Sequence, residues 1–252
     1  MASISLVLPA YNEADNIEPV IAEATPALTA ITDDYEIIVV DDGSRDETAA
    51  VARRAAERDP HVRLVQHPVN KGFGASVFSG FVNAAKDWIL YTDADRQFVL
   101  GELTRFVPLM DQADLIAGYR APRRDSFLRV LYGKGWSMLC TLLFGYTVRD
   151  VDCGFKLVRR VIIDRLAPQI QSRGATFSIE WLVRARRAGY RFAELPVTHR
   201  PRVAGSQTGA TIKVITRAFR ELWRFRMQLW REGPALECDS HAAARPPHSE
   251  GP

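Results

Sequence analysis

WILYTDADRQ, residues 88–97, is the stretch that decides the fold. It begins with Trp, Ile, Leu and Tyr, the composition of a buried strand. Two carboxylates, Asp93 and Asp95, follow, and side chains two positions apart on an extended chain point to the same face. Carboxylates aimed in one direction repel each other unless a positive group lies between them. A Mg²⁺ or Mn²⁺ ion that also binds substrate phosphates meets this requirement, and a simple polar turn is the alternative.

The strand at residues 88–92 belongs to an alternating series of strands and helices. We expect further strands at residues 4–8, 35–40, 62–65 and 114–117, and helices at residues 16–30, 46–58, 74–86 and 103–110. Several of these strands are uninterrupted apolar runs, which is typical of a parallel sheet covered by helices on both faces. The fold class is therefore α/β with a mostly parallel central sheet. A chain of 252 residues with 47% hydrophobic side chains can bury one sizeable core.

Polar residues follow each of the first four expected strands. These clusters are PAYNE at 9–13, DD at 41–42, NKGFG at 70–74 and DAD at 93–95. Ligands of open parallel sheets bind outside the carboxyl ends of the strands, so four clusters on one edge indicate a nucleotide pocket. Lys71 and the glycines after it offer a cation and close backbone approach to a diphosphate. The alternatives are a solvated lysine and simple turns, and the spacing of a Walker P-loop is absent.

Charge is distributed unevenly along the chain, although the formal net charge is only +3. Residues 1–119 contain 9 Lys and Arg against 19 Asp and Glu, whereas residues 120–231 contain 23 against 7. Such asymmetry suggests that the basic part meets lipid headgroups, phosphates or nucleic acid. An ordinary solvated basic surface is the alternative.

Two segments of the basic part are candidates for membrane contact. Residues 123–148 place several basic residues before fourteen uncharged ones, a run too short to span a bilayer. Residues 211–231 predict an amphipathic helix of the kind that lies in the bilayer interface, and a helix docked on the protein's own core is the alternative. Its basic stripe consists of Lys213, Arg217, Arg220, Arg224 and Arg231, and its apolar side of Ile212, Ile215, Phe219, Leu222, Trp223, Leu229 and Trp230.

The cysteine content, the N-terminal sequence and the length of the apolar runs indicate the cellular compartment. Three scattered cysteines argue against a zinc site or a disulfide framework and suit a reducing cytoplasm. The N-terminus has no basic region typical of a secretory signal, and no apolar run reaches the length of a spanning helix. We therefore expect a peripheral protein on the cytoplasmic face of a membrane. Residues 232–252 are polar and rich in Gly, Pro, Ala and Ser, which predicts a disordered tail.

Several motifs carry a resemblance to a known family. LVLPAYNE at 6–13, VVDDGSRDET at 39–48, NKGFGAS at 70–76 and TDAD at 92–95 resemble the inverting glycosyltransferases of family 2, which have the GT-A fold. RDVDCGFKLVRR at 149–160 and FSIEWLVRARRAGYRFAELPV at 177–197, followed by Arg202 and Gly205-Ser206, resemble the dolichyl- or polyprenyl-phosphate hexose synthases within it. The resemblance covers about residues 4–231.

The resemblance implies roles for particular residues. Asp93 and Asp95 would bind the metal and diphosphate of a nucleotide sugar, with Gln97 as a further metal ligand. Arg96 departs from the family, which usually has an apolar residue there. Pro9, Tyr11, Glu13, Asp41 and Asp42 would line the nucleoside pocket, and Arg202 and Ser206 would contact phosphates. From their charge alone, Lys71 is a candidate for contact with the diphosphate, and Arg123, Arg129 and Arg202 are candidates for holding two repelling phosphates together.

We expect a GT-A catalytic domain at residues 1–208, an interface helix at 209–231 and the tail. The expected reaction moves a hexose from a UDP- or GDP-sugar to a lipid phosphate at an anionic membrane surface, with catalysis by the metal at Asp95. A phosphate monoester is already a nucleophile at neutral pH, since its second pKa is about 6. Asp152 and Glu180 are candidates for a base or an acceptor-orienting group, and a helix cap or ion pair is the alternative.

Other functions and partners stay open. The chain could act on a non-lipid acceptor, or serve as a non-catalytic basic module for membranes or nucleic acid. A nucleotidyltransferase is disfavoured, because no Arg- and Lys-dense glycine loop follows the first strand. The module alternative leaves the carboxylate clusters unexplained, and we expect no nucleic-acid partner. An integral-membrane partner or a second copy of the chain is compatible with the sequence.

Overall fold

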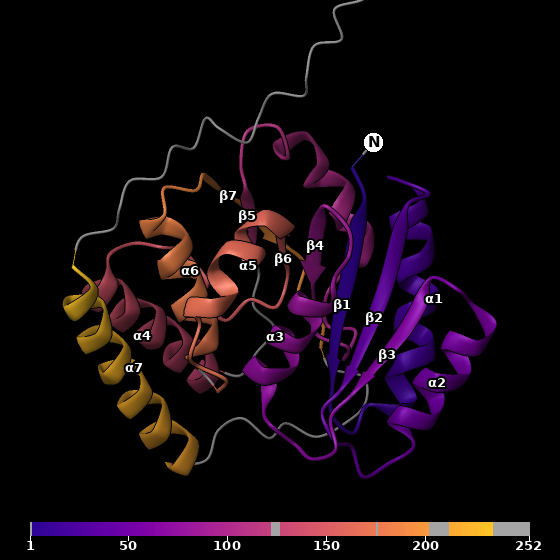
Figure 1. Cartoon of the computed structure of the whole chain (residues 1–252), viewed down its shortest axis with the longest axis horizontal. Helices are drawn as coiled ribbons and strands as arrows, with labels where there is room; N and C mark the ends of the chain where they lie inside the picture. Colours follow the sequence, from indigo (N-terminus) through magenta and orange to yellow (C-terminus); the bar gives the residue numbers. More distant parts are fainter. Residues whose placement is uncertain (1, 122–126, 175, 202–211, 234–252) are drawn as a thin grey trace, which may run out of the picture.

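A seven-stranded sheet runs through the computed structural model, and helices cover both of its faces (Figure 1). The structure describes residues 2–121, 127–174, 176–201 and 212–233, with the side chains of residues 127–132 and 212–215 outside the description. The strands are β1 (Ile4–Ala10), β2 (Tyr35–Asp41), β3 (Val62–Gln66), β4 (Trp88–Tyr91), β5 (Leu115–Arg120), β6 (Lys156–Arg159) and β7 (Phe192–Val197). Their order in the sheet is β3-β2-β1-β4-β6-β5-β7.

The strands β3, β2, β1 and β4 run parallel to one another. Leu6 of β1, for example, lies between Ile37 of β2 and Leu90 of β4. Strand β6 is antiparallel to both of its neighbours, and β7 pairs in parallel with β5. The mostly parallel sheet is therefore confirmed, and the polar residues after the first four strands meet at one edge of it.

The helices are α1 (Ala14–Thr29), α2 (Thr48–Arg58), α3 (Phe73–Asn83), α4 (Phe127–Phe144), α5 (Arg160–Leu166), α6 (Phe177–Arg187) and α7 (Ile212–Glu232). Short 3₁₀ segments are η1 (Leu100–Arg105), η2 (Val107–Leu109) and η3 (Ala167–Gln169). The stretch expected to be helical at residues 103–110 is occupied by two 3₁₀ segments, η1 and η2, rather than by an α-helix. Pro108 lies within the second, and proline has no N–H to donate in a continuing helix.

The sheet separates two apolar cores. Leu6, Ile37 and Leu90 pack on the side of α1 and α2. Their neighbours in sequence, such as Val7 and Ile89, pack on the other side, where α3, α5 and α6 lie. Successive residues of a strand point to opposite faces, which explains why uninterrupted apolar strands supply both cores.

Helix α7 lies beside α4, on the side of the molecule away from α1 and α2 (Figure 1). The rings of Phe225 and Phe144 have centroids 5.1 Å apart. Four residues of α7 are buried on this side, namely Ala218, Leu222, Phe225 and Leu229. The aromatic residues Trp223 and Trp230 are 64% and 71% exposed. One part of the helix's apolar surface thus docks on the core, as the sequence alternative has it, and the aromatic part faces outward.

Candidate functional site

The two carboxylates after β4 lie on a tight turn, residues 93–97, which we call the carboxylate turn. Asp95 is buried, and its Oδ1 atom accepts the N–H of Gln97 over 3.1 Å. Asp93 lies against Gly154 of the loop before β6. A Cβ atom at Gly154 would lie 2.5 Å from Oδ2 of Asp93, so any larger residue would displace this carboxylate from its present position. The loop that carries Asp152 is therefore held directly against the carboxylate turn.

Gln97 is anchored by the segment that follows β7. Its Nε2 atom donates to the carbonyl of Arg200 over 3.0 Å, and the N–H of Arg200 donates back to the carbonyl of Gln97 over 2.7 Å. Because the amide nitrogen is used in this way, its Oε1 atom points elsewhere, and it has no hydrogen-bond partner among the described residues. A side-chain oxygen of this kind is a suitable ligand for a hard cation.

The donor set fits a Mg²⁺ or Mn²⁺ ion that is shared with a substrate. Asp93, Asp95 and Gln97 offer only oxygen atoms, which these ions prefer. No group of three or more His, Cys, Asp and Glu residues in the described part of the chain could hold a metal ion unaided. An ion at the carboxylate turn would thus need further ligands, as expected where substrate phosphates complete the coordination.

Asp41, at the end of β2, is fully buried at the same edge of the sheet. Its Oδ1 atom accepts the N–H of Ser44 over 3.1 Å. Its Oδ2 atom is buried without a hydrogen-bond partner among the described residues. A buried acceptor left unpaired is costly, which favours a donor group from a bound molecule at this atom.

Asp42 differs from its neighbour, because both of its oxygens are used within the protein. They accept the N–H groups of Lys71 and Gly72 over 2.9 and 2.7 Å, and Nδ1 of His67 lies 2.6 Å from Oδ1. The other ring nitrogen of His67 lies 2.8 Å from the hydroxyl of Ser79. Asp42 therefore holds the loop at residues 70–74. Sequence reasoning missed His67, although its place one residue after β3 puts it at the same edge.

The loop at residues 70–74 leads into α3 with its backbone close to other segments. Gly72 has a φ of 96°, which favours glycine, and no side chain caps the helix. A Cβ atom at Gly74 would lie 2.6 Å from the carbonyl oxygen of Gly174. The Lys71 side chain is exposed. An uncapped helix start beside a lysine can bind an anion such as a diphosphate.

Pro9, Tyr11 and Glu13 lie at the end of β1 and the start of α1, adjacent to Asp41 in the sheet. Pro9 pairs with Val40, one position before Asp41. Tyr11 is partly exposed. Glu13 is buried, and its Oε2 atom accepts Nδ2 of Asn16 over 2.6 Å. The predicted nucleoside-pocket residues are thus brought together at one place.

Asp152 is exposed on a loop that the buried side chain of Lys156 anchors. The amino group of Lys156 is fully buried and donates to the carbonyl of Val151 over 3.0 Å and to the hydroxyl of Tyr91 over 3.2 Å. Burial raises the pKa of the Cys153 thiol to about 12, so this thiol stays protonated at neutral pH. Asp152 is therefore an exposed carboxylate on an anchored loop, where it can contact a bound molecule.

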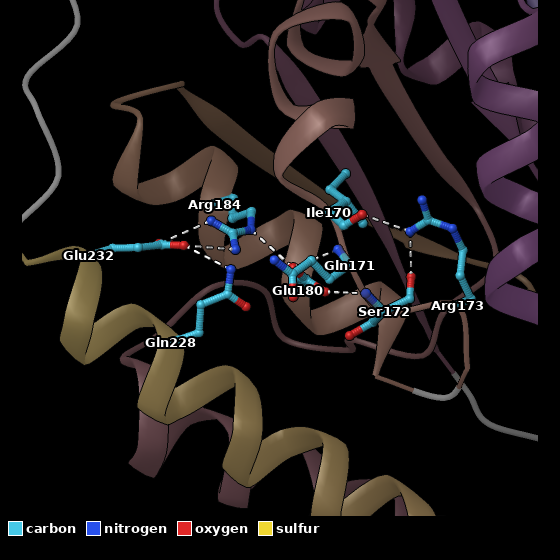
Figure 2. Close-up of polar contacts among 8 residues, drawn as sticks. All are labelled: Ile170, Gln171, Ser172, Arg173, Glu180, Arg184, Gln228 and Glu232. Atoms are coloured by element: carbon cyan, nitrogen blue, oxygen red, sulfur yellow. Dashed lines mark hydrogen bonds and ion pairs between the residues drawn. The ribbon is translucent and has the colours of Figure 1, made fainter.

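Glu180 is only 1% exposed and is surrounded by donors (Figure 2). Its oxygens accept the N–H groups of Gln171 and Ser172 over 3.0 and 2.7 Å, and Nε of Arg184 over 3.1 Å. Arg184 also donates to Glu232, near the end of α7, over 3.1 and 3.3 Å. These contacts correspond to the ion-pair alternative for Glu180, and they fasten the loop at residues 171–172 to α6.

Four predicted phosphate contacts cannot be placed. Arg123, Arg202 and Ser206 lie outside the described residues. Arg129 lies in α4, and its side chain is outside the description. The tail beyond residue 233 is also outside the description.

With this geometry in view, comparison with known proteins identifies the family. The sequence profile of Glycosyl transferase family 2 matches residues 5–167, which is more than half of the chain. The chain belongs to glycosyl transferase family 2. The matched residues include the carboxylate turn, the 70–74 loop and Asp152.

Two similar proteins have a lipid phosphate in their names. The chain is 31% identical over 210 residues to a dolichyl-phosphate beta-glucosyltransferase of Trichomonas vaginalis, covering 77% of this chain and 62% of that protein. It is 30% identical over 214 residues to an undecaprenyl-phosphate 4-deoxy-4-formamido-L-arabinose transferase of Salmonella choleraesuis, covering 84% and 64%. The chain thus spans somewhat less than two thirds of the length of these relatives.

Solved structures agree on the fold of this family 2 protein. Glucosyl-3-phosphoglycerate synthase of Mycobacterium tuberculosis, in complex with Mn²⁺, UDP and glucosyl-3-phosphoglycerate, matches with a TM-score of 0.68 at 20% identity. The match covers 95% of this chain and 82% of the synthase. The similarity supports the GT-A-like α/β fold that the sheet order describes.

Proposed function

We propose that this family 2 glycosyltransferase moves a hexose, with inversion, from a nucleoside diphosphate sugar to a polyprenyl phosphate. The carboxylate turn carries this proposal: Asp93 and Asp95 follow β4, and Asp41 ends β2, two strands away at the same sheet edge, with an Oδ2 atom that has no hydrogen-bond partner among the described residues. The named activities of the relatives from Trichomonas and Salmonella support the lipid-phosphate acceptor.

For the donor, Asp93, Asp95 and Gln97 would hold a Mg²⁺ or Mn²⁺ ion against the diphosphate. When bound, such an ion acts as a Lewis acid that stabilises the charge on the leaving diphosphate. Asp41 would accept a hydrogen bond from the nucleoside, and Lys71 would contact a phosphate from the uncapped start of α3. Asp42 and His67 keep that loop in place, so Asp42 serves the nucleoside pocket indirectly.

For the acceptor, a phosphate monoester needs little deprotonation at neutral pH. Asp152, exposed on the loop that touches Asp93, is the proposed group for orienting the acceptor or removing a remaining proton. Arg123, Arg129, Arg202 and Ser206 are proposed to offset the repulsion between acceptor phosphate and donor diphosphate. Because its carboxylate already accepts three hydrogen bonds, we assign Glu180 a structural role.

The surface of α7 supports attachment to an anionic membrane. At 100° per residue, the exposed aromatic residues lie roughly 110° from both the buried face and the basic stripe, which are about 140° apart from each other. Phe219 of the aromatic stripe (Phe219, Trp223 and Trp230) contacts Trp136 of the neighbouring α4, with ring centroids 6.2 Å apart. Helix α4 also carries the exposed apolar residues Met138 and Leu142, at 74% and 82%. Tryptophans beside arginines suit the boundary between headgroups and acyl chains. No helix among the described residues is long and apolar enough to cross a bilayer.

The test is transfer by the purified protein in Mn²⁺ or Mg²⁺. UDP- and GDP-hexoses are offered with a polyprenyl phosphate in anionic vesicles, and in parallel with soluble phosphorylated acceptors. We expect sugar transfer to the lipid phosphate only when metal is present. Transfer to a soluble acceptor alone would replace the lipid assignment, and binding to vesicles without any transfer would favour a non-catalytic membrane module.

A further inference from the structure

We propose that Glu23, on α1, is a positioning residue that holds the carboxylate turn in its metal-binding form through Arg96. Both Nε and Nη2 of Arg96 donate to the same Oε1 atom of Glu23, over 3.0 and 2.6 Å. Arg96 lies between Asp95 and Gln97, the residues that face the proposed ion. The inference rests on the proposed function, because it concerns the ion that this turn would bind.

The backbone at Arg96 explains why the turn needs an external hold. Its φ is 61°, in the left-handed region that is unfavourable for a residue with a Cβ atom. This conformation turns the chain directly after Asp95, so that the N–H of Gln97 can donate to Oδ1 of Asp95. The orientation of the Asp95 carboxylate thus depends on an unfavourable conformation at Arg96.

Glu23 also reaches the second segment that fastens the turn. Arg200, which exchanges two hydrogen bonds with Gln97, has a guanidinium nitrogen 4.0 Å from Oε2 of Glu23. One carboxylate on α1 therefore pairs with Arg96 within the turn and lies near Arg200 in the segment that fastens it. The loss of this carboxylate would free the Arg96 side chain and remove one support of Arg200.

Coulomb repulsion and a positioning role predict opposite effects on metal binding when Arg96 is removed. A guanidinium near a cation site repels a divalent ion, so its removal should strengthen metal binding if Coulomb repulsion dominated. The side chains of Arg96 and Glu23 are 29% and 30% exposed, which leaves this repulsion partly screened. The structure assigns Arg96 a positioning role, for which its removal should weaken metal binding.

The experiment measures Mn²⁺ affinity by the electron paramagnetic resonance of free Mn²⁺, with the full chain alone and with UDP or GDP. We expect Glu23→Gln and Arg96→Leu each to raise the Kd for Mn²⁺ roughly threefold to tenfold. The double variant should be no worse than Glu23→Gln alone, because Arg96 acts through its contact with Glu23. Glu18→Gln is the matched control, since Glu18 lies on the same helix and pairs with Arg58 away from the turn.

Three outcomes would overturn the inference. The first is an Arg96→Leu protein that binds Mn²⁺ as tightly as the wild type or more tightly. The second is an Arg96→Gly protein that binds Mn²⁺ no better than Arg96→Leu, since glycine adopts this φ without the clamp and should recover affinity. The third is an equal loss in Glu18→Gln. Thermal unfolding of each variant shows whether a loss is local, and a wild type that binds no Mn²⁺ with either nucleotide would contradict the proposed function itself.

Discussion

Asp41 and Asp42 are neighbours in sequence at the end of β2, yet Oδ2 of Asp41 is buried without a hydrogen-bond partner among the described residues, whereas both oxygens of Asp42 accept hydrogen bonds. In the proposed function, Asp41 therefore serves ligand binding and Asp42 supports the loop. Whether a nearby substitution affects nucleotide affinity or folding depends on which of the two carboxylates is changed.

Asp41→Asn should weaken nucleotide binding about tenfold or more, because an amide nitrogen would replace the unpaired acceptor at Oδ2. The free energy of unfolding should stay equal or rise, since a buried charge is removed. Asp42→Ala should instead lower stability by about 1–3 kcal/mol, because it leaves the N–H groups of Lys71 and Gly72 without their acceptor. Calorimetric titration measures the nucleotide affinity and denaturant unfolding measures the stability of each variant. A loss of affinity in Asp42→Ala with a loss of stability in Asp41→Asn would show that the roles of the two carboxylates are exchanged.

Glu180→Gln should destabilise the fold by several kcal/mol, because it leaves the buried Arg184 without its partner on α6. The fraction that remains folded should keep an unchanged pH profile of kcat, since no proton transfer is assigned to Glu180. Unfolding curves and a pH series measure the two effects. A stable Glu180→Gln protein with a loss of kcat above about 100-fold would instead indicate a catalytic base.

Gly154→Ala should impair metal-dependent transfer with little loss of secondary structure. The added methyl group would meet the carboxylate of Asp93, 2.5 Å from Oδ2, and displace it. Gly101→Ala is the matched control, because a Cβ atom there meets nothing within 4 Å. The measurement is kcat/KM across a Mn²⁺ series, and equal behaviour of the two variants would mean that Asp93 does not depend on this contact.

Binding to anionic vesicles should fall as salt rises, since each basic residue near the surface contributes about 1 kcal/mol that salt screens. Trp223→Ser with Trp230→Ser should lower binding further at every salt concentration. The control variant carries Val82→Ser and Val161→Ser, at two exposed apolar residues of other helices. Co-sedimentation measures binding. If the affinity for vesicles depends neither on lipid charge nor on the two tryptophans, α7 is not the membrane-binding helix.

The sequence could predict the parallel strands and the carboxylate turn, because apolar runs and their polar ends are local patterns. It could not separate the roles of Leu222 and Trp223, since both are apolar and only docking on α4 and α6 decides which is buried. The partners of Glu180 include the backbone N–H groups of Gln171 and Ser172, which no side-chain pattern reports. Strand β6 was missed because it is short and carries the buried Lys156.

The most direct test of the central claim is hexose transfer to a polyprenyl phosphate by wild type and Asp95→Asn, with Mn²⁺ and with a chelator. The substitution keeps the size of the side chain and removes the charge proposed to hold the ion. We predict that the wild type transfers sugar only with Mn²⁺. Asp95→Asn, once a thermal unfolding curve has shown that it is folded, should lose at least about 100-fold in kcat. Near-wild-type transfer by Asp95→Asn, or transfer in the presence of the chelator, would contradict the account.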